Sequence, residues 1–138
     1  MQPIAYLFFK GQCRAAMTYY GELFGSTPEI MTFSDMPDAD RAKMPGAPDD
    51  AVMHCALAID EGWIYGADDP FDEMRAMDGS YVTLALPDEA ETQRVWAALA
   101  DGADVRMPLT PMFWTPLFGL LTDKFGIRWM IMTDVAPE

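Results

Sequence analysis

The chain has 138 residues, of which 51% are hydrophobic, and its formal net charge is −13. This length and apolar content suffice for one folded domain and exclude a largely disordered chain. The negative charge argues against nucleic acid and membrane partners, because phosphate backbones and anionic lipids repel an acidic protein. No apolar run approaches the roughly 18 to 20 residues that a membrane-spanning helix requires.

The start of the chain shows no basic region followed by an apolar one, which is the pattern of a secretory signal. We therefore expect a cytoplasmic protein. Its two cysteines, Cys13 and Cys55, are then expected to be reduced, partly buried thiols, because reducing compartments keep thiols free. The twelve methionines suit irregular cores and adaptable binding surfaces alike, so their number does not decide between the two.

The first half of the chain predicts a strand, a helix and then three strands. Apolar residues recur at helical spacing before Gly25, a natural helix end, and short apolar runs flank this segment. The predicted elements are a strand over 4–9, a helix over 12–24, a strand over 29–34, a mobile surface loop over 35–50, and strands over 51–59 and 63–66.

The second half repeats this order after an acidic linker over 67–79. Its predicted elements are a strand over 80–86, a helix from Asp88 to about Leu99, and strands over 104–108, 112–121 and 127–133, with a turn over 123–126. The fold class is therefore α+β, with two βαβββ modules that form a curved mixed sheet around a cavity. The modules, about 1–70 and 79–138, belong to one domain over 1–138, because each alone is too small to bury its sheet.

Side chains alternate between the two faces of each predicted strand. We expect the bulkier rows to face the helices and the rows of small or polar side chains to line a concave face with room for a ligand. The bulky rows are Met53, Cys55, Leu57 and Ile59, and Val82, Leu84 and Leu86. The opposite rows are His54, Ala56 and Ala58, and Tyr81, Thr83 and Ala85.

His54 is the only histidine of the chain. On the small-residue face it could act as an acid–base group, a ligand or a hydrogen-bond donor, since imidazole does all three near neutral pH. A structural histidine bonded to a neighbouring carbonyl or carboxylate is the other interpretation. Cys55 points to the opposite face, so a Cys–His pair is not expected.

The aromatic stretch over 112–119 has two interpretations. Trp114 and Phe118 could wall a planar or apolar ligand or a dimer seam, or they could be core residues. Pro116 inside a strand requires an edge or a bulge, so we expect this segment at a rim. Asp123 is expected to start a turn rather than to catalyse. The sequence contains no phosphate-binding loop, dinucleotide fingerprint or nucleophile elbow.

Two stretches of the sequence resemble a known family. They are Tyr6-Leu7-Phe8-Phe9-Lys10-Gly11-Gln12-Cys13-Arg14-Ala15-Ala16 with Tyr19-Tyr20 and Leu23-Phe24-Gly25, and Phe113-Trp114, Phe118-Gly119, Thr122-Asp123-Lys124-Phe125-Gly126-Ile127 and Trp129-Met130. They are similar to the start and end of PhnB-like proteins, a branch of the vicinal oxygen chelate superfamily. That superfamily includes glyoxalase I, bleomycin-resistance proteins and extradiol dioxygenases. The resemblance implies paired βαβββ modules around a cavity and a homodimer.

Enzymes of this superfamily hold a divalent metal with His, Gln or Glu on the inner strands. Carried over to this chain, those positions fall on Ala5, Tyr81 and Met130, and a fourth lies near 63–66. Alanine and methionine cannot replace hard oxygen or imidazole ligands. We therefore predict no metal site and no cofactor. His54 matches a histidine typical of the branch but is not at a ligand position.

These observations favour a protein that binds a small, partly apolar molecule and acts as a homodimer. We expect the cavity to be lined by His54, Tyr81, Thr83, Trp114, Phe118 and Met130. Whether the chain catalyses a reaction stays open. The alternative is a lyase or isomerase, either metal-dependent through unconventional ligands or metal-free with His54 as the catalytic group. A regulatory dimer without a ligand is a third possibility. An anionic ligand would need local positive charge, which Lys10, Arg106 and Arg128 could supply.

Overall fold

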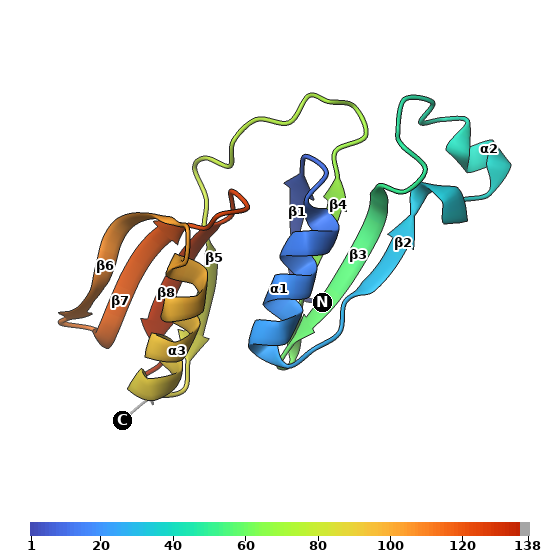
Figure 1. The fold of residues 1–138 in the computed structure, drawn as a ribbon. Coiled ribbons are helices and arrows are strands. Elements are labelled where there is room, and N and C mark those ends of the chain that lie inside the picture. Colours follow the sequence, from blue (N-terminus) through green and yellow to red (C-terminus); the bar gives the residue numbers. More distant parts are fainter. Residues whose placement is uncertain (136–138) are drawn as a thin grey trace. The chain divides into compact units, whose positions relative to one another are not determined.

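The computed structural model describes residues 1–135, and the chain divides into two compact units, Met1–Arg75 and Ala76–Glu138 (Figure 1). Both units contain a strand, a helix and three further strands in this order, and each has its own four-stranded mixed sheet. The α+β class and the two βαβββ modules predicted from the sequence are thus confirmed. The first unit carries an additional short helical insertion between its second and third strands.

The sheet of the first unit has the order β1-β4-β3-β2, so the first two strands of the chain lie at its edges. Strand β1 runs parallel to β4, and the other neighbours are antiparallel. The elements are β1 (Ala5–Phe9), α1 (Cys13–Phe24), β2 (Glu29–Thr32), the 3-10 helix η1 (Phe33–Asp35), α2 (Asp38–Arg41), β3 (Val52–Ile59) and β4 (Gly62–Asp68).

Helix α1 covers one face of this sheet and packs on β3 and β4. Leu7, Phe9, Cys55 and Leu57 are buried on that face, which the alternation predicts for Cys55 and Leu57. The helix ends at Gly25, whose φ of 70° is left-handed and favours glycine. The opposite face of the sheet is not covered by α1 and carries Tyr6, Phe8 and His54.

Met53 corrects one prediction of the alternation. The register between β2 and β3 shifts between Met31 and Thr32, where Met31 faces His54 but Thr32 faces Val52. This bulge breaks the strict alternation at Met53. Its side chain therefore lines a pocket together with Tyr6, instead of facing the helix.

The second unit has the equivalent sheet order, β5-β8-β7-β6. Strand β5 runs parallel to β8, and the remaining pairs are antiparallel. The elements are β5 (Val82–Leu86), α3 (Glu89–Ala100), β6 (Asp104–Met112), β7 (Thr115–Thr122) and β8 (Arg128–Thr133).

Helix α3 packs on this second sheet and starts at the N-cap Asp88, whose carboxylate accepts a hydrogen bond from the Glu91 N–H at 2.8 Å. The predicted turn before β8 is also present, and Gly126 closes it at a φ of 90°. Asp123 is buried there and accepts hydrogen bonds from the N–H of Ile127 and from Nε1 of Trp129. Through these contacts Asp123 stabilises the turn, which agrees with the turn-forming role predicted for it from the sequence.

Two other predicted segments differ from the structure. The strand expected over 112–121 begins at Thr115, because Phe113 and Trp114 form the turn of a hairpin whose first strand, β6, continues to Met112. Strand β7 is an interior strand and not a rim, although Pro116 does lie where its register with β6 shifts. The loop expected over 35–50 contains the end of η1 and the short helix α2.

None of the helices within residues 1–135 has the length and apolar character needed to cross a bilayer.

Candidate functional site

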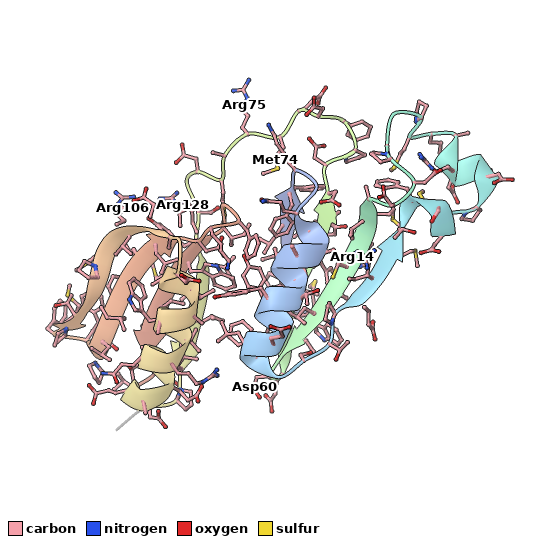
Figure 2. The ribbon with its side chains drawn as sticks, viewed as in Figure 1. Arg14, Asp60, Met74, Arg75, Arg106 and Arg128 are labelled. Carbon is pink, nitrogen blue, oxygen red and sulfur yellow. The ribbon has the colours of Figure 1, made fainter. Side chains whose placement is uncertain are left out.

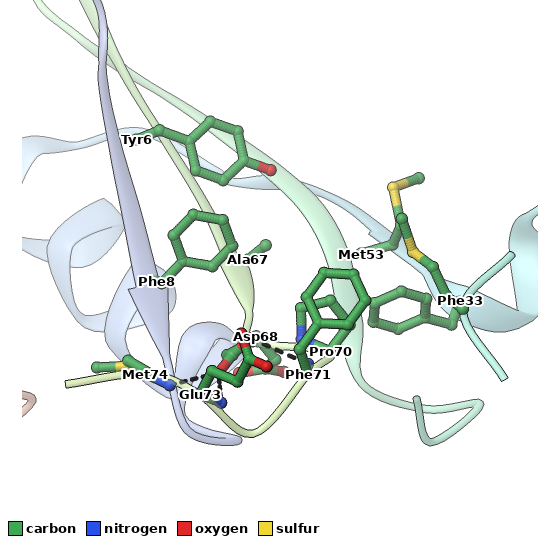
Figure 3. A pocket seen from close by; sticks show the side chains of 12 residues that line it. Tyr6, Phe8, Phe33, Met53, Ala67, Asp68, Pro70, Phe71, Glu73 and Met74 are labelled. Atoms are coloured by element: carbon green, nitrogen blue, oxygen red, sulfur yellow. Dashed lines mark hydrogen bonds between the residues drawn. The ribbon is translucent and has the colours of Figure 1, made fainter. Parts of the chain in front are cut away.

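The first unit contains an apolar pocket of about 480 Å³ on the face of its sheet opposite α1 (Figure 3). Tyr6 and Phe8 of β1 contribute aromatic rings on one side, and Phe33 of η1 and Phe71 of the loop after β4 contribute two more. The complete lining is Tyr6, Phe8, Phe33, Met44, Met53, Ala67, Asp68, Asp69, Pro70, Phe71, Glu73 and Met74.

One wall of the pocket is the loop that follows β4, and Asp69 organises it. The Asp69 carboxylate accepts hydrogen bonds from the backbone N–H groups of Phe71 at 3.0 Å, Glu73 at 2.8 Å and Met74 at 2.8 Å. The Phe71 N–H above all, with those of Glu73 and Met74, holds the pKa of this carboxyl below its usual range. An ionised Asp69 therefore fixes the part of the chain that presents Phe71 to the pocket.

A second wall comes from the segment after β2, and Arg41 organises it. Its guanidinium donates to the carbonyls of Met44 and Ala47 and to the Asp49 carboxylate at 3.0 Å. The same guanidinium lies 5.5 Å from the centre of the Phe33 ring, within the range of a cation–π contact. One side chain thus holds both Phe33 and Met44 in place at the pocket.

Three of the lining residues are methionines, Met44, Met53 and Met74. Thioether side chains are flexible and polarizable, so they adapt to ligands of different shape and contact aromatic rings well. Phe71 is 61% exposed. The wall that it forms is therefore accessible to a molecule that enters the pocket.

His54 lies beside this pocket and is joined to it by Tyr6. The Tyr6 hydroxyl and Nδ1 of His54 are 2.9 Å apart, and the Tyr65 ring packs edge-on against the imidazole at 5.0 Å between centres. Burial, followed by the nearby Cys13 and Cys55 thiols, raises the pKa of Tyr6, so its phenol stays protonated at neutral pH. The hydrogen bond leaves Nε2 of His54 as the ring nitrogen that another molecule can use. His54 itself lines a neighbouring hollow of about 350 Å³ with Met31, Trp63 and Tyr65.

The other predicted site residues belong to the second unit and form two groups there. Thr83 lies opposite Met130 on the paired strands β5 and β8, and Tyr81 directly precedes β5. Trp114 and Phe118 contact each other at 5.3 Å between ring centres near the β6–β7 turn. The roles predicted for these residues in ligand binding stay predictions, as does the catalytic role of His54.

The sequence did not point to the residues that shape the pocket from outside the sheet, above all Phe33, Met44, Phe71 and Met74. The last three lie in the two segments interpreted as a mobile loop and a linker, where no hydrophobic period exists, and Phe33 lies in the strand predicted over 29–34, where the structure has η1. The available signal was the presence of large apolar side chains among prolines, glycines and aspartates, which a purely solvated loop does not need.

The side chains at the positions that the resemblance assigns to the superfamily's metal do not suit a divalent cation. Ala5 and Met130 offer no hard ligand. The Tyr81 oxygen accepts hydrogen bonds from the guanidiniums of Arg106 and Arg128, and these positive charges repel a cation. Among residues 1–135, no group of three or more His, Cys, Asp and Glu side chains is placed to hold a metal ion.

Residues 2–132 match the family described as 3-demethylubiquinone-9 3-methyltransferase. The chain belongs to this PhnB-like family. Protein YjdN of Escherichia coli K12 is 29% identical over 135 residues, which cover 91% of this chain and 90% of that protein.

Solved structures agree with this assignment. Protein PA1353 from Pseudomonas aeruginosa is 33% identical with a TM-score of 0.85, and the match covers 97% of this chain and 98% of that one. A Bacillus cereus protein described as a 3-demethylubiquinone-9 3-methyltransferase, PhnB protein, is 20% identical with a TM-score of 0.80, covering 97% and 100%. A glyoxylase/bleomycin resistance protein/dioxygenase domain from Frankia sp. EAN1pec shares the fold, with a TM-score of 0.64 at 12% identity, covering 98% of both chains. The resemblance predicted from the two terminal stretches is thereby confirmed.

Proposed function

We propose that this protein binds a small, largely apolar molecule in the pocket of its first unit. The observation that carries the proposal is the pocket itself, whose volume of about 480 Å³ lies within the range of roughly 300 to 1,000 Å³ usual for small-molecule sites. Four aromatic rings and three methionines line it. Burying these side chains under a ligand supplies a hydrophobic driving force.

The polar groups of the pocket favour a neutral or cationic ligand. Asp69 and Glu73 both lie in its lining, and their charges repel an anion. The Asp69 oxygens are already engaged with backbone N–H groups. Within residues 1–135 the Tyr6 hydroxyl bonds to His54 alone, and its oxygen keeps the capacity to accept, so it is a better-placed polar partner for the ligand. The flat rings of Tyr6, Phe8 and Phe71 suit a planar or aromatic molecule.

Membership in the family supports a small-molecule site, since one neighbour in the fold is described as a bleomycin resistance protein. We propose binding that does not require a metal, because the carried-over ligand positions include Ala5 and Met130. We do not propose methyl transfer for this chain, because the sequence has no nucleotide-type cofactor loop. The homodimer implied by the resemblance stays a prediction, which the molar mass in solution will test.

A second candidate function is metal-free acid–base catalysis, and the Tyr6–His54 hydrogen bond favours it. A protonated phenol that fixes one imidazole nitrogen leaves the other in a defined orientation, which a general acid or base requires. If the protein turns over a substrate, His54→Gln should abolish the turnover while leaving apolar binding in the pocket intact. Turnover that survives this substitution would exclude His54 as the acid–base group.

The binding proposal can be tested with N-phenyl-1-naphthylamine, an uncharged dye whose fluorescence rises in apolar sites. We expect saturable binding to the wild type, and a Kd at least about fivefold higher for Phe71→Ala, because a large apolar contact is lost. Phe113→Ala is the matched control, since Phe113 is an exposed aromatic of the second unit, 97% accessible. Equal effects of the two substitutions, or no saturable binding, would overturn the proposal.

The metal-independent part of the proposal has its own test. After dialysis against mixed divalent metals, elemental analysis of the purified protein should find no tightly held metal, and dye binding should not change with a chelator. About one retained metal per chain would contradict metal-independent binding and would favour metal-dependent catalysis.

A further inference from the structure

Two arginines of the second unit converge on a single phenol oxygen. Nη1 of Arg106 lies 3.1 Å from the Tyr81 hydroxyl, and Nη2 of Arg128 lies 2.7 Å from the same oxygen. Both guanidiniums donate, so the hydroxyl accepts twice. Figure 2 shows Arg106 and Arg128 at the same end of this unit.

The three residues are brought together by the sheet and not by the sequence. Tyr81 directly precedes β5, Arg128 is the first residue of β8 beside it, and Arg106 belongs to β6 at the opposite edge. The guanidinium carbon of Arg128 also lies 4.1 Å from the centre of the Tyr81 ring. This cation–π contact fixes the orientation of Arg128, whose side chain is only 13% exposed.

The charge of this cluster is poorly compensated. Arg128 has one carboxylate partner, Asp78, at 3.6 Å, and the Asp78 side chain is 97% exposed. Arg106 has no carboxylate within ion-pair distance among residues 1–135. The chain has 22 acidic and 9 basic residues, so carboxylate partners are abundant elsewhere. Holding two guanidiniums together without carboxylate partners costs free energy. An anion bound between the two guanidiniums would offset this cost.

We propose that Tyr81, Arg106 and Arg128 form a binding site for the oxyanion group of a small molecule, a carboxylate or a phosphoryl group. A guanidinium presents paired N–H donors that match the oxygens of such groups. Because the Tyr81 oxygen accepts from both arginines, its own hydrogen is free to donate, and no acceptor for it occurs among the described side chains. The site lies wholly in the second unit and stands independently of the apolar pocket in the first.

The number of charges favours one ligand class over the other. The two guanidiniums carry two positive charges, and the one carboxylate paired with them, that of Asp78, is 3.6 Å away and 97% exposed, so water screens its charge. A phosphoryl dianion should therefore bind more tightly than a monoanionic carboxylate of similar size.

The test is an NMR titration of the full-length, 15N-labelled protein with inorganic phosphate and, separately, with acetate. Sodium chloride keeps the ionic strength constant, so that screening does not change. We expect saturable shifts of the amides and arginine Nε signals near Tyr81, Arg106 and Arg128, with the lower Kd for phosphate. Saturation by acetate alone would also support the site and would assign it to carboxylates.

Substitutions separate the site from the net charge. Arg106→Gln, at an exposed side chain, should raise the Kd at least about fivefold, because a charge-assisted contact is lost, and Tyr81→Phe should raise it less. Arg94→Gln is the matched control, since it removes the same charge from α3 of the same unit, where Arg94 pairs with Glu91. Arg106→Lys should restore binding in part, because the charge returns without the fork.

Three results would overturn the proposal. They are the absence of saturable shifts with both anions, shifts of equal size with chloride, and equal weakening by Arg94→Gln and Arg106→Gln. The amide spectrum of each variant shows whether the fold is intact, so a loss of binding cannot be confused with unfolding.

Discussion

The two units share one order of elements, but they secure their first helix in different ways. Helix α3 is capped locally, by the side chain of Asp88 immediately before it. Helix α1 follows Gln12, which provides no side-chain cap. Its first N–H, that of Cys13, instead donates at 3.0 Å to the buried carboxylate of Asp68, at the end of β4. The same cap role is therefore played by an adjacent residue in one unit and by a distant one in the other.

This difference matters for the functional face of each unit. The other Asp68 oxygen accepts the N–H of Val52 at 2.9 Å, so one carboxylate joins α1, β3 and β4. The next residue, Asp69, organises the pocket loop. In the first unit the cap and the pocket wall are thus consecutive residues of one strand end. In the second unit, the cap Asp88 belongs neither to the cluster of Tyr81, Arg106 and Arg128 nor to the aromatic pair Trp114 and Phe118.

The largest effect should come from breaking the distant cap. Asp68→Ala leaves two backbone N–H groups, of Cys13 and Val52, without their acceptor in a buried place. Each such loss costs about 1 to 3 kcal/mol, so we expect a free energy of unfolding lower by about 3 kcal/mol. Urea unfolding followed by circular dichroism measures it.

The neighbouring substitution Asp69→Ala serves as the control for this experiment. The Asp69 carboxylate bonds to backbone N–H groups of its own loop, so its removal should leave the midpoint of unfolding much closer to the wild type. An equal loss in both variants would mean that Asp68 has no special role as a cap.

A smaller loss of stability is expected from a substitution at Gly119, a glycine beneath α3. A Cβ at Gly119 would lie 2.7 Å and 2.8 Å from Cζ3 and Cη2 of Trp96, so Gly119→Ala should destabilise the fold by about 2 kcal/mol through overpacking. At Gly66 in the first unit the nearest atom to a Cβ is the Leu7 oxygen at 3.2 Å, so Gly66→Ala should cost less. Trp96→Phe should recover part of the loss in Gly119→Ala. No recovery would show that the clash is with the sheet and not with Trp96.

The contrast between local and distant contacts also explains what the sequence could reveal. Both helices were predictable because their apolar spacing and their end signals, Gly25 and Asp88, lie within the helices or next to them. The cap that Asp68 provides for α1 was not predictable, because no residue near Gln12 indicates a partner at the end of β4. The resemblance to the family rests on residues of the strands and helices and of the turns at 113–114 and 123–126, and it predicts the fold class well.

The candidate site was less predictable for the same reason. Tyr6 of β1 and His54 of β3 lie on one face of the sheet, and the alternation predicted this face for His54 alone. Phe71 and Met44 reach the pocket through loops that Asp69 and Arg41 organise, and these side-chain-to-backbone bonds leave no periodic signal. Met53 was assigned to the wrong face because a bulge is invisible in a period-two pattern.

Removal of the local cap should have a moderate effect. Asp88→Ala deletes the acceptor of the Glu91 N–H at the exposed start of α3, and such changes cost about 1 kcal/mol. The matched substitution in the first unit, Gln12→Ala, should change the free energy of unfolding by much less, because Gln12 caps nothing. Both are measured by urea unfolding. A larger loss for Gln12→Ala than for Asp88→Ala would reverse the comparison between the two helices.

The smallest effect should be a pH dependence of dye binding in the first unit that originates at Asp69. The pKa of this carboxyl lies below its ordinary value of 3.8, the N–H of Phe71 being the largest cause. A lowered pKa stabilises the loop at all pH values above the ordinary one, and this contribution is lost as the pH falls through the lowered pKa. Affinity for N-phenyl-1-naphthylamine should therefore be constant from pH 7 to about 5 and should fall below about pH 4. Asp69→Asn, which cannot ionise, should bind the dye more weakly at pH 7 and should show a flatter profile in acid. A wild-type profile in this variant would place the acid sensitivity at another carboxylate, of which Glu73 in the same loop is the first to test.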